Sequence, residues 1–254
     1  MIESWSVVTV DAVESVGFYG SLAVDGSGRL HLSYWDFTNR DLKYATCAAA
    51  CAIAANWQTV TVDAAGDVGE YTSLAVDGTG HAHVSYYDNS NDDLKYATCA
   101  ADCAAAASWQ TATVDAGGNV GRYTSLAVGA GERLHVSYYD DSNLDLKYAT
   151  CAGACTTGAT WQAATVDAAG NVGRDNSLGV DANGRLHISY FDESSFDLRY
   201  ATCAAACTTP ANWQATTVDA AGVVGTYTSL AVDANGRVHV SYVNGSSLDL
   251  KYIE

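Results

Sequence analysis

Short runs of alternating apolar and polar residues, separated by clusters of Gly, Asp, Asn and Ser, recur along the whole chain. Between residues 57 and 99 these runs are Trp57–Asp63, Thr72–Asp77, Ala82–Asp88 and Asp93–Cys99. Alternation over so few residues, bounded by turn formers, predicts short β-strands. The connections 78–80 and 89–92 are of hairpin length, so we expect neighbouring strands to pair antiparallel.

The same unit returns every 52 residues without insertion or loss. Its repeats start at Trp5, Trp57, Trp109, Trp161 and Trp213. Repeats of four antiparallel strands are typical of radially arranged sheets. We therefore predict an all-β fold: one domain over residues 1–254, formed as a five-bladed β-propeller with four antiparallel strands per blade.

The two ends of the sequence suggest how such a ring closes. The last repeat stops at Glu254, before the position of its cysteine, and so lacks an outer strand. The first repeat begins with a spare strand of that kind, Trp5–Asp11. An uncovered strand edge is a liability that natural sheets avoid. We expect this N-terminal strand to complete the last blade and close the ring.

Eight cysteines form four pairs of the pattern C-x3-C. The pairs are Cys47 with Cys51, Cys99 with Cys103, Cys151 with Cys155, and Cys203 with Cys207. A structural metal needs four ligands in one place, and the flanking residues supply neither a second pair nor a histidine. We interpret each pair as a local disulfide, which favours an extracellular or cell-surface location. The N-terminal sequence itself has no signal-peptide pattern.

The net charge of the chain excludes some classes of binding partner. With 29 acidic against 12 basic residues, the net charge is −17. Such a field repels nucleic acid and anionic membranes, and no apolar run is long enough to insert into a bilayer. We expect a monomer without a cofactor.

The segment SLAVDGSGRLHLSY, residues 21–34, and its copies resemble the first two strands of NHL and sialidase-like propeller repeats. The number of blades is similar to that of the tachylectin-2-type lectins. This resemblance implies that the Ser-Leu-Ala-Val strand is innermost and the Trp strand outermost. It also implies that the cysteine loops lie on one face and most acidic loops on the other.

Acidic residues on that second face stand at strand ends. Three sets recur: Asp11, Asp63, Asp115, Asp167 and Asp219; Asp41, Asp93, Asp145, Asp197 and Asp249; and Asp36, Asp88, Asp140 and Asp192. Carboxylates at strand ends commonly cap local backbone amides, and we favour that role. Calcium bound between carboxylates and carbonyls is the alternative, although no D-x-D-x-D-G loop supports it. We predict no defined metal site.

An aromatic residue precedes the last of these acids in four blades, and an amide often follows. The candidate ligand-binding residues are Trp35, Asp36, Asn39, Tyr87, Asp88, Asn91, Tyr139, Asp140, Asn143, Phe191 and Asp192. An aromatic face beside a carboxylate and an amide is suited to a sugar. The alternative is that these rings pack between blades, the commoner fate of strand aromatics. The fifth blade has Val243 and Asn244 here, so at most four sites are expected.

A second candidate site lies where the chain enters each inner strand, at the mouth of the expected channel. Its residues are Tyr19, Glu70, Tyr71, Arg122, Tyr123, Arg174, Asp175 and Tyr227. These positions differ between repeats, as an asymmetric site requires, but a solvated rim that tolerates change is an equal alternative. The repeated histidines, such as His83, are expected to have a structural role because buried polar groups must be paired.

Near-identical blades favour several equal weak sites, which gain from multivalency. The leading hypothesis is therefore a secreted, non-catalytic, lectin-like module that binds carbohydrate, and not an enzyme. One alternative is a spacer or protein-interaction propeller of a cell-surface protein. Another is a glycoside hydrolase, for which the only unrepeated acids at the mouth, Glu70 and Asp175, are the candidate carboxylate pair.

Overall fold

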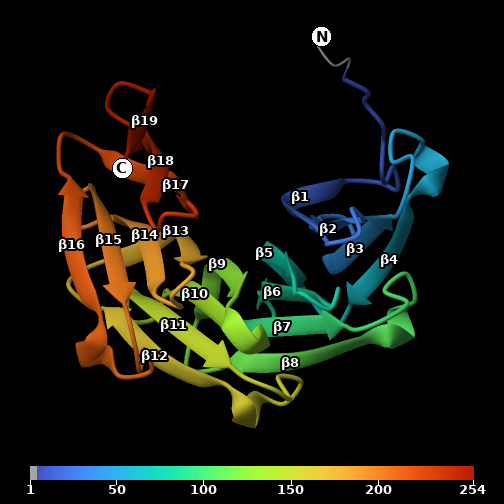
Figure 1. The fold of residues 1–254 in the computed structure, drawn as a ribbon, viewed down its shortest axis with the longest axis horizontal. Helices are drawn as coiled ribbons and strands as arrows, with labels where there is room; N and C mark the ends of the chain where they lie inside the picture. The colour runs from blue at the N-terminus through green and yellow to red at the C-terminus, as the bar shows by residue number, and fades with distance from the viewer. Residues whose placement is uncertain (1–4) are drawn as a thin grey trace.

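The structure is a computed structural model that describes residues 5–254. They form five antiparallel sheets, here called blades 1 to 5, arranged in an arc around a central opening (Figure 1). Blade 1 contains β1 (Val16–Val24), β2 (Leu30–Asp36), β3 (Asp41–Cys47) and β4 (Gln58–Asp63), and blade 2 contains β5 (Val68–Val76), β6 (Ala82–Asp88), β7 (Asp93–Cys99) and β8 (Trp109–Asp115). Blade 3 contains β9 (Val120–Val128), β10 (Leu134–Asp140), β11 (Asp145–Cys151) and β12 (Gln162–Asp167), and blade 4 contains β13 (Val172–Val180), β14 (Leu186–Asp192), β15 (Asp197–Cys203) and β16 (Gln214–Asp219). Blade 5 contains β17 (Val224–Val232), β18 (Val238–Asn244) and β19 (Asp249–Ile253).

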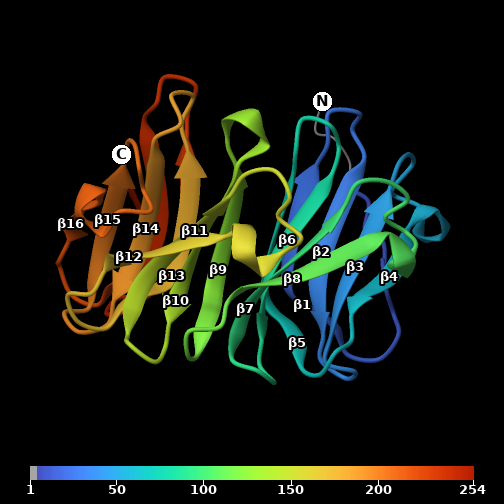
Figure 2. The same ribbon diagram turned by 90° about the horizontal axis from the view of Figure 1, so that it is seen from below.

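Within each blade the strands pair in the order of the sequence, from the innermost strand outward. Seen from the side, the blades stand next to one another along the arc (Figure 2). The innermost strands β1, β5, β9, β13 and β17 each pack against the next. The predicted all-β propeller architecture and the strand order are therefore confirmed. The remaining elements of residues 5–254 are short 3-10 turns: Ala54–Asn56, Ala106–Ser108, Ala130–Glu132, Gly158–Thr160 and Pro210–Asn212. No helix in this part of the chain is long and apolar enough to cross a membrane.

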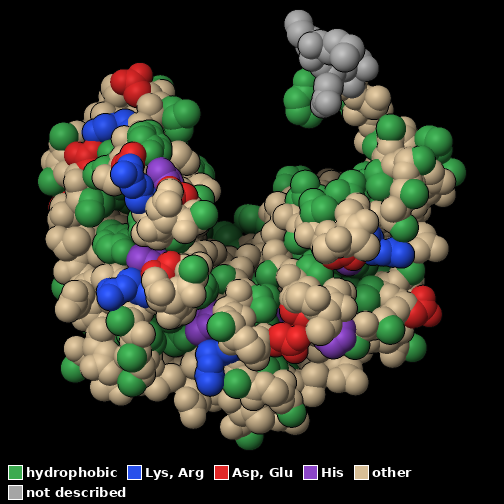
Figure 3. Space-filling view, viewed as in Figure 1, with side chains coloured by type: hydrophobic (Ala, Val, Ile, Leu, Met, Phe, Trp, Pro, Cys, Tyr) green, Lys and Arg blue, Asp and Glu red, His purple; other side chains and the backbone are tan. Residues whose placement is uncertain are grey.

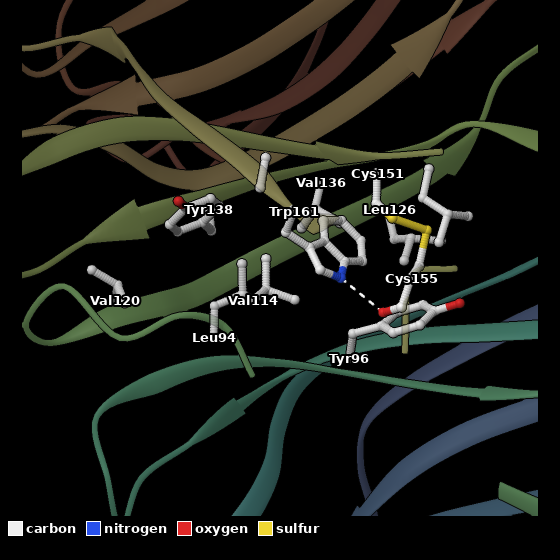
Figure 4. Close-up of a cluster of buried hydrophobic side chains, with 12 residues drawn as sticks. Leu94, Tyr96, Val114, Val120, Leu126, Val136, Tyr138, Cys151, Cys155 and Trp161 are labelled. Atoms are coloured by element: carbon white, nitrogen blue, oxygen red, sulfur yellow. Dashed lines mark hydrogen bonds between the residues drawn. A yellow bond between two sulfur atoms is a disulfide. The ribbon is translucent and has the colours of Figure 1, made fainter. Parts of the chain in front are cut away.

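Neighbouring blades are held together by apolar clusters that repeat at each junction. Between blades 2 and 3, Tyr96 and Val114 pack with Val136 and the indole of Trp161 (Figure 4). The rings of Tyr96 and Trp161 meet edge-on with centroids 5.2 Å apart. Fully burying such side chains contributes roughly 2 kcal/mol each, so these clusters are the main source of stability between blades.

Polar contacts fix the same junctions. The Thr72 hydroxyl of blade 2 donates to the Ser33 hydroxyl of blade 1 at 2.7 Å, and both groups are buried. The backbone N–H of Leu74 donates to Ser21 Oγ at 3.0 Å. Equivalent bonds recur at the next junctions. Because buried polar groups need partners, these bonds specify how one blade sits on the next.

The repeated histidines have the structural role that was expected. His83 Nδ1 lies 2.6 Å from the Tyr96 hydroxyl, and His83 Nε2 lies 3.2 Å from Asp77. Burial lowers the pKa of His83, which keeps the ring neutral at pH 7. These contacts lie within one blade.

All four predicted disulfides are present, each within one C-x3-C segment. No free cysteine remains among residues 5–254. Each loop ends next to a repeat tryptophan: the Trp161 indole N–H donates to the Cys155 carbonyl at 2.9 Å. The disulfides thus hold the loops that orient the tryptophans, and they fit an oxidising compartment.

The structure differs from the sequence prediction at the ends of the arc. Blade 5 has three strands, and residues 5–15 form no strand and do not pair with β19. The arc is open (Figures 1 and 3). Successive innermost strands pack against each other, but β17 and β1 do not pack in this way. The expected closure by Trp5–Asp11 is therefore not formed, since its partner strand lies across the opening.

Candidate functional site at the rim of the central opening

Each innermost strand carries a bulge at the position predicted to ring the channel mouth. In blade 2 the pairing shifts between Glu70 and Ser73, so the inner strand has one residue more than its neighbour there. The extra residue, Tyr71, has a φ of 53°. A left-handed backbone at a non-glycine residue is strained and is common at functional sites, where a bulge redirects a side chain. The same conformation occurs at Tyr19, Tyr123, Asp175 and Tyr227, with φ of 53°, 55°, 49° and 52°.

The bulges bring three of the predicted tyrosines into one row of tilted, contacting rings. The ring centroids of Tyr19 and Tyr71 are 4.6 Å apart, and those of Tyr71 and Tyr123 are 4.7 Å apart. Burial and the neighbouring tyrosines raise the pKa of the Tyr71 hydroxyl, so it stays protonated. Neutral hydroxyls and ring faces at one rim are suited to a neutral polyhydroxy ligand.

Asp175 interrupts the series of tyrosines in blade 4. Its carboxylate accepts a hydrogen bond from the backbone N–H of Tyr227 at 3.0 Å. Burial raises the pKa of Asp175, while this N–H and the Arg174 guanidinium favour the charged form. Opposed effects of this kind occur at catalytic carboxylates.

Glu70 is an acid at a rim position where the other repeats have none. Burial raises the pKa of Glu70, and the Asp67 carboxylate adds to the increase. The charges of Arg122 and Arg40 act in the opposite direction. A carboxyl group with a raised pKa is what a general acid requires.

The two rim arginines do not extend freely into the opening. The Arg122 guanidinium lies over the Tyr87 ring at 5.1 Å, and Arg174 lies over Tyr139 at 5.3 Å. Arg174 also pairs with Glu193 at 3.0 Å. These cation–π contacts connect the rim to the aromatic positions of the other predicted site.

Blade 1 adds an aromatic cluster that the sequence analysis did not identify as a whole. Phe37, an exposed side chain, packs against Phe18 and Trp35 with ring centroids 5.6 and 5.4 Å apart. The ring centroids of Tyr19 and Trp35 are 6.0 Å apart, so Tyr19 links this cluster to the row of tyrosines. Within residues 5–254 the buried indole N–H of Trp35 has no acceptor. The available signal was that Phe37 has no aromatic counterpart in the other repeats.

The residues of the first predicted site are placed in turns and in the protein interior. Asp88 accepts hydrogen bonds from the Ser90 and Asn91 backbone N–H groups and from the Asn91 side-chain amide, at 3.0, 3.1 and 2.9 Å. Asp36 with Asn39 and Asp140 with Asn143 repeat this arrangement, and Asp192 caps its turn through two backbone N–H groups. The capping role of these carboxylates is therefore confirmed.

The four aromatic residues that precede these acids are buried. Tyr87 and Tyr139 have no exposed surface, and Trp35 and Phe191 have 7% and 6%. Their ring faces are covered by neighbouring side chains, so the described contacts give them packing roles. Sugar stacking at this set stays a prediction. Among residues 5–254 no group of three His, Cys, Asp or Glu side chains is arranged to hold a metal ion.

No known family profile matches this sequence, and no curated protein matches it significantly. Solved structures, in contrast, share its fold. It is similar to the α-L-arabinofuranosidase Arb93A of Fusarium graminearum, solved with an iminosugar inhibitor, with a TM-score of 0.59, 12% identity and coverage of 93% of this chain and 80% of that one. An exo-β-1,3-galactanase of Phanerochaete chrysosporium, solved with galactose, has a TM-score of 0.57, 10% identity and coverage of 99% and 62%. An α-L-arabinofuranosidase of Lactobacillus brevis has a TM-score of 0.52, 13% identity and coverage of 91% and 85%.

These similarities correct the functional expectation drawn from the sequence. The similar structures are glycoside hydrolases, and they support the propeller fold but not the NHL or tachylectin-2-type repeat. The prediction of a non-catalytic, lectin-like module that is not an enzyme was therefore wrong. The near-identical blades had been taken to indicate several equal binding sites. The repeats differ at the rim, however, and Glu70 and Asp175 lie there.

Proposed function

We propose that this protein is a glycoside hydrolase whose active site lies at the rim of the central opening, with Glu70 and Asp175 as its carboxylate pair. The observation that carries the proposal is that these two acids stand at rim positions where the other repeats have no acid, and burial raises the pKa of both. Hydrolysis of a glycosidic bond needs two carboxyl groups whose environments differ. The substrate class is a carbohydrate, and the four disulfides suit work outside the cell.

The surroundings assign a role to each acid. Glu70 lies near the Asp67 carboxylate, which favours the protonated form, so Glu70 is the general acid that protonates the leaving oxygen. Asp175 accepts the Tyr227 N–H and lies near Arg174, which both favour its charged form. Asp175 is therefore the carboxylate that acts on the opposite side of the scissile bond, as base or nucleophile.

The aromatic residues of the rim supply the binding surface. Tyr19, Tyr71 and Phe37 offer ring faces to a sugar, and the two tyrosines also offer hydroxyls. Asymmetry between blades then gives one site per chain, not four.

The test is an assay of reducing-sugar release from arabinan, galactan and xylan and of cleavage of aryl glycosides. Glu70→Gln and Asp175→Asn should each lower kcat by about 100-fold or more while the melting temperature stays within a few degrees. Glu132→Gln, at an acid in the β9–β10 connection away from the rim, is the matched control and should leave the rate unchanged. Absence of any cleavage, or full activity in both rim variants, would contradict the proposal.

A further inference from the structure

The junction between blades 4 and 5 contains a cavity with largely apolar walls. Its volume is about 450 Å³. Its apolar walls are Leu198, Tyr200 and Val218 of blade 4 and Val238, Val240 and Ile253 of blade 5. The last of these residues belongs to β19, so the cavity lies beside the free edge of blade 5.

The repeat shows what fills this place elsewhere. Two repeats earlier, the same positions are Leu94, Tyr96, Val114, Leu134, Val136 and Ala149. There they pack around Trp161, the first residue of the outer-strand segment of blade 3 (Figure 4). Trp109 and Trp213 pack on Tyr44 and Tyr148 in the same way at the neighbouring junctions.

The tryptophan that corresponds to this cavity by repeat position is Trp5. Its side chain is 96% exposed, whereas Trp161 is 8% exposed. The segment Trp5–Asp11 has the sequence WSVVTVD, which matches WQTVTVD at Trp57–Asp63. Its last residue is already placed like an outer-strand acid: Asp11 pairs with Lys43 and accepts the Tyr34 hydroxyl at 2.8 Å, as Asp63 does with Lys95 and Tyr86.

The free edge of β19 is complementary to that segment. Leu250 and Tyr252 are 80% and 60% exposed, although their equivalents Leu94 and Tyr96 are buried. In blade 1, Lys43 pairs with Thr61, Tyr44 with Val60 and Ala45 with Thr59. The same register on β19 places Thr9 opposite Lys251, Val8 opposite Tyr252 and Val7 opposite Ile253.

The blade 1 end of the arc carries the reciprocal feature. A cavity of about 220 Å³ is lined by Val10, Asp11, Val16, Gly17, Leu32 and Tyr34, among others. At the next junction Leu42 closely approaches Gly69, whose Cβ position lies 2.7 Å from Leu42 Cα. Leu250 is the equivalent of Leu42, so this second cavity fits Leu250. The two ends of the arc thus match each other as neighbouring blades do.

We propose that the free edge of β19 and its cavity bind the Trp5–Asp11 segment of a second copy of this chain. The N-terminal segment and β19 lie on opposite sides of the opening (Figure 1), and Asp11 holds the segment to blade 1. Docking within one chain requires β17 to meet β1, which would bend four junctions that are each fixed by buried bonds. A second copy meets the same surface without that change. The contact joins unlike surfaces, so copies associate head to tail.

The experiment measures the mass of the whole chain by sedimentation velocity over a range of concentrations. The wild type should associate as its concentration rises. Trp5→Ala, which removes the docking side chain, and Val238→Arg, which fills the cavity, should each weaken association about 30-fold or more, as expected for a buried Trp anchor. Ile53→Ala, an exposed apolar residue on a cysteine loop, is the control and should associate as the wild type does.

Mixing the two variants gives the sharper result. The Trp5→Ala chain keeps an intact cavity and the Val238→Arg chain keeps an intact segment, so together they should form a 1:1 heterodimer that grows no further. A labelled peptide of sequence WSVVTVD should bind the Trp5→Ala chain and not the Val238→Arg chain. A wild type that is monomeric at all concentrations, with Trp5 shielded from an aqueous quencher, would show closure within one chain and overturn the proposal. Association that is insensitive to Trp5→Ala would overturn it as well.

Discussion

Asp63 and Lys95 form an ion pair between the outer strand of blade 1 and the third strand of blade 2, with side chains only 7% and 12% exposed. The Tyr86 hydroxyl donates to the same Asp63 oxygen at 2.7 Å. Although burial opposes ionisation, the hydrogen bonds from Lys95 and Tyr86 lower the pKa of Asp63 below its usual value. The repeat of this pair at Asp115 with Lys147 makes it a general connection between blades.

Removing one partner of this pair is expected to be costly. Lys95→Met leaves the Asp63 carboxylate buried without its cation, so the free energy of unfolding should fall by about 3 kcal/mol. The double variant Asp63→Leu with Lys95→Met should regain part of that loss, because no charge is then left unpaired. Arg40→Met is the control: Arg40 is 66% exposed in its pair with Asp67, and its loss should cost less than about 1 kcal/mol. Urea unfolding at pH 7 measures all three, and equal losses in Lys95→Met and Arg40→Met would contradict the argument.

The buried histidines make stability depend on pH below neutrality. Burial, with a smaller effect of Arg133, lowers the pKa of His135 from 6.5 to about 4. Between pH 6.5 and about pH 4, His135 is therefore protonated in the unfolded chain but neutral in the folded chain. The contribution of neutral His135 is therefore present above pH 6.5 and is lost as the pH falls to 4, by an amount on the order of 3 kcal/mol.

His135→Gln tests this dependence. The variant loses the bond to Tyr148 and is less stable at pH 7, but its stability should fall less steeply than that of the wild type between pH 6.5 and 4.5. Urea unfolding at four pH values in this range gives the two slopes. Identical slopes would show that His135 does not titrate in this way.

The turn caps that follow the second strand of each blade should contribute to stability. Asp88 is 2% exposed and accepts three hydrogen bonds, so Asp88→Ala should lower the free energy of unfolding by about 2 kcal/mol. Asn244 has the same position in blade 5, where it accepts two backbone N–H groups near the surface. Asn244→Ala should therefore cost clearly less. Thermal unfolding of the two variants decides, and an unchanged melting temperature for Asp88→Ala would refute the capping role.

The repeat made the blades predictable, because each strand depends on its own alternation and on turn residues that recur every 52 positions. Tyr71 shows why the rim was harder to predict. Its position was identified from differences between repeats, but its left-handed backbone and the bulge beside it depend on the pairing of β5 with β6. Leu250 shows a third case. Its equivalents in the other repeats are buried, but Leu250 itself is exposed because no further blade covers it at the end of the arc.

The first predicted site has residue types suited to a sugar, but the structure gives these residues capping and packing contacts. Asp88 and Tyr87 stand side by side in the sequence, but the turn uses the carboxylate and the junction with blade 3 covers the ring. Sequence spacing does not distinguish a carboxylate that caps a turn from one that meets a ligand. The unrepeated acids Glu70 and Asp175 escape this ambiguity, since the scaffold does not need them in every blade.

The proposed roles at the rim predict the pH profile of hydrolysis. Glu70 must be protonated to act as general acid, so kcat/KM should decline as the pH rises through the raised pKa of Glu70. Arg122 favours the charged form of Glu70, and Arg122→Gln should therefore raise that pKa further and move the alkaline limb to higher pH. Arg185→Gln, at a charge on the β13–β14 turn, is the control and should leave the limb in place. The limb is measured from initial rates on an aryl glycoside between pH 4 and 9. A shift to lower pH in Arg122→Gln would assign the limb to a group other than Glu70.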